Sequence, residues 1–282
     1  MSKAPTRPPQ PAPTVANAAD TELAYEAAQA VVQTHRRLAE WLKVGVTLGQ
    51  VDHFVARTLD DLGCRSCFLG YRPYRSPAFP SQACLSVNEC VVHGTAGYYT
   101  KPMQPGDILK IDIGVTRRGW IGDAAWTYVF KEASPDVQRL LDCGKESLAR
   151  GVQTLRPGNL LLAWAQEVQD YVEHQCGYHL VRGLGGHGYG RKLHGPPFVS
   201  NVVPTYSGEW PDAMITMTPG MLLAVEPMIA VGTGEVRQKP REWPVYTADG
   251  SLSVHYEHDV LITESGPRVL TEGMETLPDI VG

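Results

Sequence analysis

Residues 108–130 of the chain read ILKIDIGVTRRGWIGDAAWTYVF, a pattern typical of a β-hairpin with one aspartate on each strand. Apolar and polar side chains alternate along the first strand, so Asp112 lies on the face opposite the apolar one. The chain turns near residues 117–119, which places Asp123 roughly opposite Asp112. Facing like charges destabilise a ladder, and a cation between them would remove the repulsion. The alternative is a solvated hairpin whose aspartates keep the protein in solution.

The length, charge and hydropathy of the chain exclude several classes of protein. At 282 residues the chain is long enough for one large domain or two moderate ones. Its 25 basic and 30 acidic residues give a formal charge of −5, so no overall basic field indicates a nucleic-acid site. Apolar runs are too short to span a membrane, and the N-terminus lacks the apolar segment of a secretion signal. We therefore expect a soluble, cytoplasmic protein.

The cysteines are interpreted as free thiols. There are six, and a chain of this length without an export signal favours reduced cysteines over disulfides. Cys64 and Cys67 form the only CxxC pair. Because no second pair follows at a comparable spacing, a zinc ribbon is not predicted.

The chain divides into an arm and one domain. Residues 1–20 are rich in Pro, Ala and Thr, which predicts a flexible arm, and residues 21–282 are expected to form a single domain. Apolar residues at helical spacing predict helices at 21–43, where Thr21 is the candidate cap, and at 48–62, 135–154 and 160–175.

Two segments of the chain repeat each other. MQPGDILKID at 103–112 matches MTPGMLLAVE at 217–226 with an offset of 114, and Gly45 and Gly158 are 113 residues apart. Two matches at nearly one offset predict a pseudo-symmetric protein in which each half supplies helices, a Pro-Gly turn and a strand. The half-repeats are about 21–133 and 134–282.

A metal centre is predicted where the two halves meet. Asp112 and Glu226 are equivalent in the repeat, which indicates a shared centre between the halves. The full set of candidate ligands is Asp112 and Asp123 in the hairpin, His187 in the glycine-rich loop GLGGHGYG, Glu226 in the predicted strand MLLAVEPMIAV, and Glu257 in a second predicted strand, SVHYEHDVLIT. Four carboxylates and one imidazole suit a pair of divalent ions such as Co, Mn, Fe or Zn. Bridging acids would hold the ions about 3.5–4 Å apart with a nucleophilic water between them. Taken singly, each residue would more often be a structural or surface group than a metal ligand, and it is their joint occurrence in a repeat that indicates a site.

Two further histidines are candidates for contacting the scissile group. His93 lies in SVNECVVHG, and His194 follows His187 by seven residues. An imidazole can donate a hydrogen bond to a developing oxyanion or to a leaving amide. No GxSxG elbow is present, so a serine-hydrolase arrangement is not indicated. The alternative for either histidine is a structural role.

The chain resembles the type I methionine aminopeptidases of the pita-bread metallopeptidase fold. The matching segments are ACLSVNECVVHG, DILKIDIGVTRRGWIGDAAW, GLGGHGYGRKLH, MLLAVEPMI and SLSVHYEHDVLIT, which span most of residues 83–265. The resemblance implies an α/β (α+β) pita-bread fold, a pseudo-two-fold repeat of helices and antiparallel-rich β-sheet around a central dinuclear metal site. No long helical insertion separates His194 from Glu226, which argues against the type II branch.

The resemblance also implies roles for individual residues. The metal ligands would be Asp112, Asp123, His187, Glu226 and Glu257, with Asp112 bidentate and Asp123 and Glu257 bridging. Glu226 would also pass protons between the nucleophilic water and the leaving amine. His93 would contact the nitrogen of the cleaved bond, and His194 the substrate carbonyl or the tetrahedral intermediate.

A methionine pocket is implied by the same resemblance. Its candidate residues are Cys67, Tyr71, Cys84 and Trp243, with His93 and His194 as further substrate contacts. Thiols and aromatic rings pack well on a thioether, although Cys67 and Tyr71 are as readily ordinary core residues. Two positions depart from the family: Leu193 stands where an aromatic is common, and Gly195 where an acidic residue is usual.

The predicted activity is that of a hydrolase, a metalloaminopeptidase that removes the initiator methionine from nascent chains with a small second residue. A metal-bridging water would attack the first peptide bond. We expect nascent N-termini as partners, the Pro-rich arm as a candidate ribosome contact, no membrane or nucleic-acid site, and a monomer. One alternative is a pita-bread peptidase that cleaves before proline or acts on dipeptides, although such enzymes usually carry an extra N-terminal domain. The other is a non-catalytic binding module, which would be expected to have lost ligands.

Overall fold

The computed structural model describes residues 14–15, 17–73 and 76–282. Most of the predicted arm therefore lies outside the described residues. Helices in the described part are α1 (Ala18–Trp41), α2 (Leu48–Asp61), α3 (Pro135–Thr154) and α4 (Leu162–Gln169), the π-helix η1 (Asp170–Gln175), and the 3₁₀-helices η2 (Pro211–Met214) and η3 (Met274–Thr276).

The strands fall into two five-stranded and two three-stranded sheets in the described part of the chain. The first large sheet contains β1 (Arg65–Ser66), β2 (Cys84–Val87), β4 (Ile108–Arg117), β5 (Trp120–Phe130) and β16 (Ile280–Val281). The second contains β7 (Gly185–Gly188), β8 (Gly195–Ser200), β9 (Leu222–Val225), β14 (His258–Thr263) and β15 (Gly266–Val269). One small sheet contains β6 (His179–Leu180), β10 (Met228–Ala230) and β13 (Ser253–His255). The other contains β3 (Cys90–Val92), β11 (Val236–Gln238) and β12 (Val245–Thr247).

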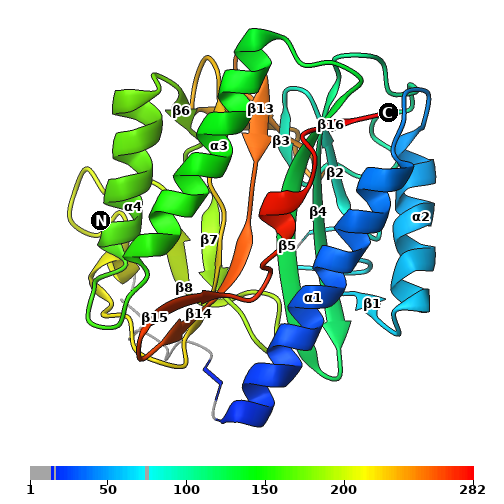
Figure 1. The fold of residues 1–282 in the computed structure, drawn as a ribbon. Coiled ribbons are helices and arrows are strands. Elements are labelled where there is room, and N and C mark those ends of the chain that lie inside the picture. The colour runs from blue at the N-terminus through cyan, green and yellow to red at the C-terminus, as the bar shows by residue number, and fades with distance from the viewer. Residues whose placement is uncertain (1–13, 16, 74–75) are drawn as a thin grey trace.

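The helices cover the sheets in two similar pairs. Figure 1 shows α1 and α3 lying across the strands, with α2 beside α1 and α4 beside α3. α1 packs on β4 and β5 of the hairpin, and α3 packs on β13. The predicted mixture of helices and antiparallel-rich sheet is confirmed. None of the helices in the described ranges is both long and apolar enough to cross a membrane.

Local sequence accounts for the helix limits, with one correction. The predicted start of the first helix at Thr21 is wrong, because Asn17 is the N-cap and its side chain accepts a hydrogen bond from the Asp20 backbone N–H. The hydroxyl of Thr21 instead donates to the Asn17 carbonyl. α2 begins as predicted, with a capping box between Thr47 and Gln50. α3 has the predicted limits, and the fourth predicted helix changes to π geometry at its end.

The internal repeat is visible in matched turns. Gly45 and Gly158 have nearly the same left-handed backbone, with φ of 92° and 91°. Their N–H groups donate to equivalent carbonyls, Gly45 to Met103 at 2.8 Å and Gly158 to Met217 at 2.9 Å. Met103 and Met217 are the first residues of the two segments that match in sequence, 103–112 and 217–226. The segments that match in sequence therefore adopt the same local structure.

Two predicted strands are each divided at a glutamate. β9 and β10 are separated by Glu226 and Pro227, and β13 and β14 by Tyr256 and Glu257. β9 pairs with β14 in one sheet, and β10 pairs with β13 in another. Proline has no backbone N–H for a ladder, which favours a break at this position. Both glutamates thus lie where the chain passes from one sheet to the next.

The hairpin is buried on both faces. Every residue of β5 is buried, and on β4 even Lys110 is only 1% exposed. The Lys110 ammonium donates to the Asn88 carbonyl at 2.5 Å, which satisfies part of its hydrogen-bonding capacity. The alternative of a solvated hairpin is therefore wrong.

The close approach of α1 to β5 provides a test of the packing. A Cβ on Gly122 would lie 2.5 Å from the carbonyl carbon and oxygen of Ala27 in α1. We expect Gly122→Ala to lower the free energy of unfolding by about 1–3 kcal/mol, because an added methyl in a packed core forces the backbone apart. Urea unfolding followed by circular dichroism measures this change. The control is Gly97→Ala, at a glycine with open space around it. Equal urea midpoints for the two variants would contradict the expected clash.

Candidate metal centre

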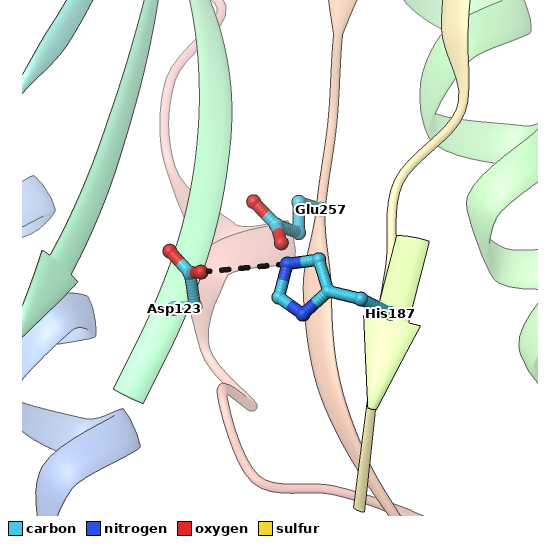
Figure 2. A group of neighbouring side chains, drawn as sticks. All are labelled: Asp123, His187 and Glu257. Atoms are coloured by element: carbon cyan, nitrogen blue, oxygen red, sulfur yellow. Dashed lines mark ion pairs between the residues drawn. The ribbon is translucent and has the colours of Figure 1, made fainter. Parts of the chain in front are cut away.

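Three side chains from different strands converge on one point. Asp123 comes from β5, His187 from β7, and Glu257 from the break before β14, and one ligand atom of each lies within 4.8 Å of the others. His187 Nε2 is 3.9 Å from Asp123 Oδ2, as Figure 2 shows. All three residues are buried. Asp123 belongs to one large sheet and His187 to the other, so the group forms only in the folded chain.

A second group shares Glu257 with the first. Its members are Glu226, His255 and Glu257, again with one ligand atom of each within 4.8 Å of the others. His255 Nε2 lies 3.0 Å from Glu226 Oε2. The sequence interpretation missed His255. The available signal was its position two residues before Glu257, since such residues share a face of a strand.

The two hairpin aspartates are offset by two residues along the ladder. Asp112 pairs with Ala125 and Asp123 with Gly114, so the predicted placement of Asp112 opposite Asp123 is corrected to a diagonal one. Diagonal neighbours still share a face of the ladder. Both aspartates line one cavity of about 580 Å³. His187, Glu226 and Glu257 line the same cavity, so the structure brings all five predicted ligands together.

Backbone packing holds the ligands in place. His187 was predicted in a glycine-rich loop, but it lies on β7. The preceding Gly186 approaches the Ala224 carbonyl too closely for any side chain, so glycine here lets β7 lie against β9. The backbone N–H of Asp123 donates to Asp259 Oδ2 at 2.8 Å. Asp259 is fully buried and fixes the ligand strand from the opposite sheet.

The electrostatics fit divalent cations. Burial raises the pKa of all four carboxyl groups, and neighbouring carboxyls raise the pKa of Asp123 and Glu257 further. Burial lowers the pKa of His187 to about 3, which leaves its imidazole neutral. Among the described residues, buried Oδ1 atoms of Asp112 and Asp123 have no hydrogen-bond partner. Unpartnered carboxylate oxygens beside a neutral imidazole are the donors that Mn²⁺, Fe²⁺, Co²⁺ or Zn²⁺ accepts.

The cavity extends from the ligands to an apolar wall. Of the predicted substrate residues, Tyr71, Cys84, His93, His194 and Trp243 line it. Cys67 is absent from the described lining. Its Sγ packs against the hairpin, where a Cβ on Gly114, the ladder partner of Asp123, would lie 2.5 Å away. All six cysteines are free, as predicted. Further apolar lining residues that the sequence interpretation missed include Phe68, Phe79, Leu184, Phe198 and Met228.

An aromatic cluster forms one side of this wall. The Trp243 ring meets Phe79 edge to face at 5.2 Å between centroids and His93 at 6.1 Å. Phe79 follows a proline-rich stretch with no periodic pattern, so the sequence carried no signal for its role. Leu193 and Gly195, the two departures from the family pattern, also line the cavity.

The two predicted substrate histidines lie at the cavity in different settings. His194 Nδ1 is 2.7 Å from the Tyr71 hydroxyl, and its ring meets His187 edge to face at 4.4 Å between centroids. His93 has a φ of 59°, a left-handed backbone that is rare outside glycine and costs about 1–3 kcal/mol. Such strain is typical of functional sites. Burial lowers the pKa of His93 to about 4, so it is neutral near pH 7.

Comparison with known proteins assigns the family. The model of metallopeptidase family M24 matches residues 22–264. The chain belongs to this family. It is 36% identical to methionine aminopeptidase 1 of Bacillus subtilis, in an alignment that covers 87% of this chain and 94% of that protein. The crystal structure of a Thermotoga maritima methionine aminopeptidase superposes with a TM-score of 0.81 at 32% identity, covering 90% of this chain and 97% of that one. The predicted resemblance to methionine aminopeptidases is confirmed.

A structure of much lower sequence identity shares the fold. An Xaa-Pro dipeptidase from Bacillus anthracis superposes with a TM-score of 0.69 at 18% identity. The match covers 91% of this chain but 61% of the dipeptidase. At this identity the likeness concerns the fold alone.

Proton release provides a test of the metal centre. Because burial raises the carboxyl pKa values, the ion-free M24 site holds protons at a pH where free carboxyls are ionised. A divalent ion requires the carboxylate form, so binding must release protons. We expect the apparent affinity for Mn²⁺ to rise between about pH 6 and pH 8. Calorimetry in two buffers of different ionisation enthalpy measures the protons released. An affinity that is independent of pH, without proton release, would contradict the assignment.

Proposed function

We propose that this M24 metallopeptidase removes the N-terminal methionine from peptides whose second residue is small. One observation carries the proposal: a single cavity contains both the acidic ligand cluster and an apolar wall of thiol and aromatic groups. The methionine aminopeptidases of Bacillus subtilis and Thermotoga maritima support it, because they match nearly the whole chain.

The proposed cofactor is a pair of divalent ions. The ligands would be Asp112, Asp123, His187, Glu226 and Glu257. Glu257 lies close to Asp123 and His187 on one side and to Glu226 on the other, and this arrangement supports two neighbouring ions. When bound, such ions supply Lewis acidity and lower the pKa of water toward neutral pH. The same acidic cluster attracts the free α-amine of a substrate, which restricts cleavage to the first residue of a chain.

The remaining chemistry belongs to side chains of the protein. Glu226 is a largely buried carboxyl, with its side chain 13% exposed, and burial raises its pKa, as suits a group that takes a proton from water and returns it to the leaving amine. His93 is neutral and lines the cavity, where its N–H can donate to the group being cleaved. His194 is fixed by Tyr71 and can donate to the carbonyl oxygen as charge develops there.

The methionine side chain would occupy the apolar end of the cavity. Cys84, Phe79 and Trp243 line that region, and sulfur–aromatic contacts stabilise a bound thioether by about 0.3–1.5 kcal/mol. Leu193 is smaller than an aromatic residue and leaves more room on one side.

Nascent chains are the proposed physiological substrates, and the protein would act on them as a cytoplasmic monomer. The proposed ribosome contact is the Pro-rich arm, which lies largely outside the described residues. Its composition supports this role, since proline-rich segments can dock on aromatic grooves.

Peptide cleavage provides the decisive experiment. We expect protein loaded with Mn²⁺, Co²⁺, Fe²⁺ or Zn²⁺ to release methionine from Met-Ala-Ser and, far more slowly, from Met-Leu-Ser. Loss of the proton carrier in Glu226→Gln should lower kcat by about 10²–10⁴-fold. Liquid chromatography of free methionine measures both rates.

The control for this experiment is Glu264→Gln, at an exposed glutamate in the turn after β14, which should retain the full rate. Absence of methionine release with all four metals would disprove the proposed activity. Full activity in Glu226→Gln would disprove only the proposed role of that residue.

A further inference from the structure

His255 is a buried histidine that the proposed reaction does not use. It is the last residue of β13 and is 1% exposed. Its Nε2 lies 3.0 Å from Oε2 of Glu226, within hydrogen-bonding distance. Glu226 is the residue to which we assign both metal binding and proton transfer. A group that fixes this carboxylate therefore affects both functions.

The backbone of His255 is held from two sides. Its N–H donates to the Thr127 hydroxyl at 3.1 Å, and the same hydroxyl donates to its carbonyl at 2.7 Å, which connects it to β5 of the hairpin. On the other side His255 pairs with Met228 of β10, two residues after Glu226. His255 is thus held in the β10–β13 ladder, and Glu226 lies two residues before its ladder partner Met228, which keeps the ring and the carboxylate close together.

The chemistry of the two groups determines which one donates. A histidine ring can carry an N–H at Nε2 in its neutral as well as in its charged form. An ionised carboxylate can only accept hydrogen bonds. The contact with an ionised Glu226 is therefore an Nε2–H donation to Oε2, a bond to a charged acceptor in a buried setting.

We propose that His255 is a positioning residue, which holds Oε2 of Glu226 by an Nε2–H hydrogen bond and leaves the other carboxylate oxygen for metal binding and proton transfer. The effect that we predict on the reaction rate rests on the proposed function. The structural consequence, the orientation of a metal-ligating carboxylate, is measurable without substrate. In the competing arrangement His255 binds the metal directly. The distances allow it, because one ligand atom from each of Glu226, His255 and Glu257 lies within 4.8 Å of the others.

Two substitutions separate these arrangements. His255→Gln keeps an N–H donor at nearly the same reach, whereas His255→Leu removes it and fills similar space. The probe is Co²⁺ alone, whose visible absorption reports the number and type of ligands. We expect His255→Gln to match the wild-type spectrum and affinity. His255→Leu should bind the same number of ions with about 10–100-fold lower affinity, the usual cost of losing a partner that orients a ligand.

A changed cobalt spectrum in His255→Gln, or the loss of one bound ion in His255→Leu, would overturn the proposal and identify His255 as a ligand. Wild-type cobalt affinity in His255→Leu would also overturn it. Urea unfolding of each variant checks folding. If His255→Leu does not fold, the spectrum of His255→Gln still decides between the two arrangements.

Kinetics provide the second measurement. With Met-Ala-Ser we expect His255→Leu to lose about 10–100-fold in kcat with little change in KM, and His255→Gln to recover most of the rate. The matched control is His179→Gln, an exposed histidine on β6, which should behave as wild type. Equal loss in His255→Gln and His255→Leu would overturn the positioning role. Absence of methionine release by the wild type would disprove the proposed function, while the cobalt measurements would still test His255.

Discussion

The burial of four carboxyl groups around one cavity is the constraint on which the rest of this structure depends. Each of these groups alone would be expensive to remove from water, and together they repel one another, which is why their pKa values are raised. The fold holds them there with strand pairing that does not depend on the side chains themselves. His187 is neutral and cannot balance the negative charge of the ionised carboxylates. Divalent cations are the partners that balance this charge.

The internal repeat explains how one chain assembles such a centre. Each half repeats the same turn, with Gly45 bonded to Met103 and Gly158 to Met217. In the first half the ligands extend from a continuous hairpin. In the second half Glu226 lies at the break between β9 and β10, and Glu257 lies at the break between β13 and β14. At these breaks the two glutamates lie outside the strand ladders, and their side chains line the same cavity as the aspartates of the other half.

In the proposed activity, selectivity would arise from the groups that surround the candidate metal ligands. The ligand set is compatible with many hydrolytic reactions, whereas the wall containing Cys84, Phe79 and Trp243 is suited to a soft, apolar side chain. His93 adjoins this wall through its contact with Trp243, and His194 adjoins the metal ligands through His187. The reacting bond would therefore lie between the two histidines, with the first side chain on the apolar side and the α-amine near the acids.

The sequence by itself determined the hairpin, the repeat, most helix limits and the five candidate ligands, because strand period, turn residues and repeat spacing are local properties of the chain. Only the tertiary structure decided the diagonal offset of Asp112 and Asp123, the interrupted strands and the contact of Cys67 with Gly114. It also brought Phe79 to Trp243 and His255 to Glu226. Periodicity assigns a side chain to a face, but its neighbours depend on register and on contacts between residues far apart in the chain.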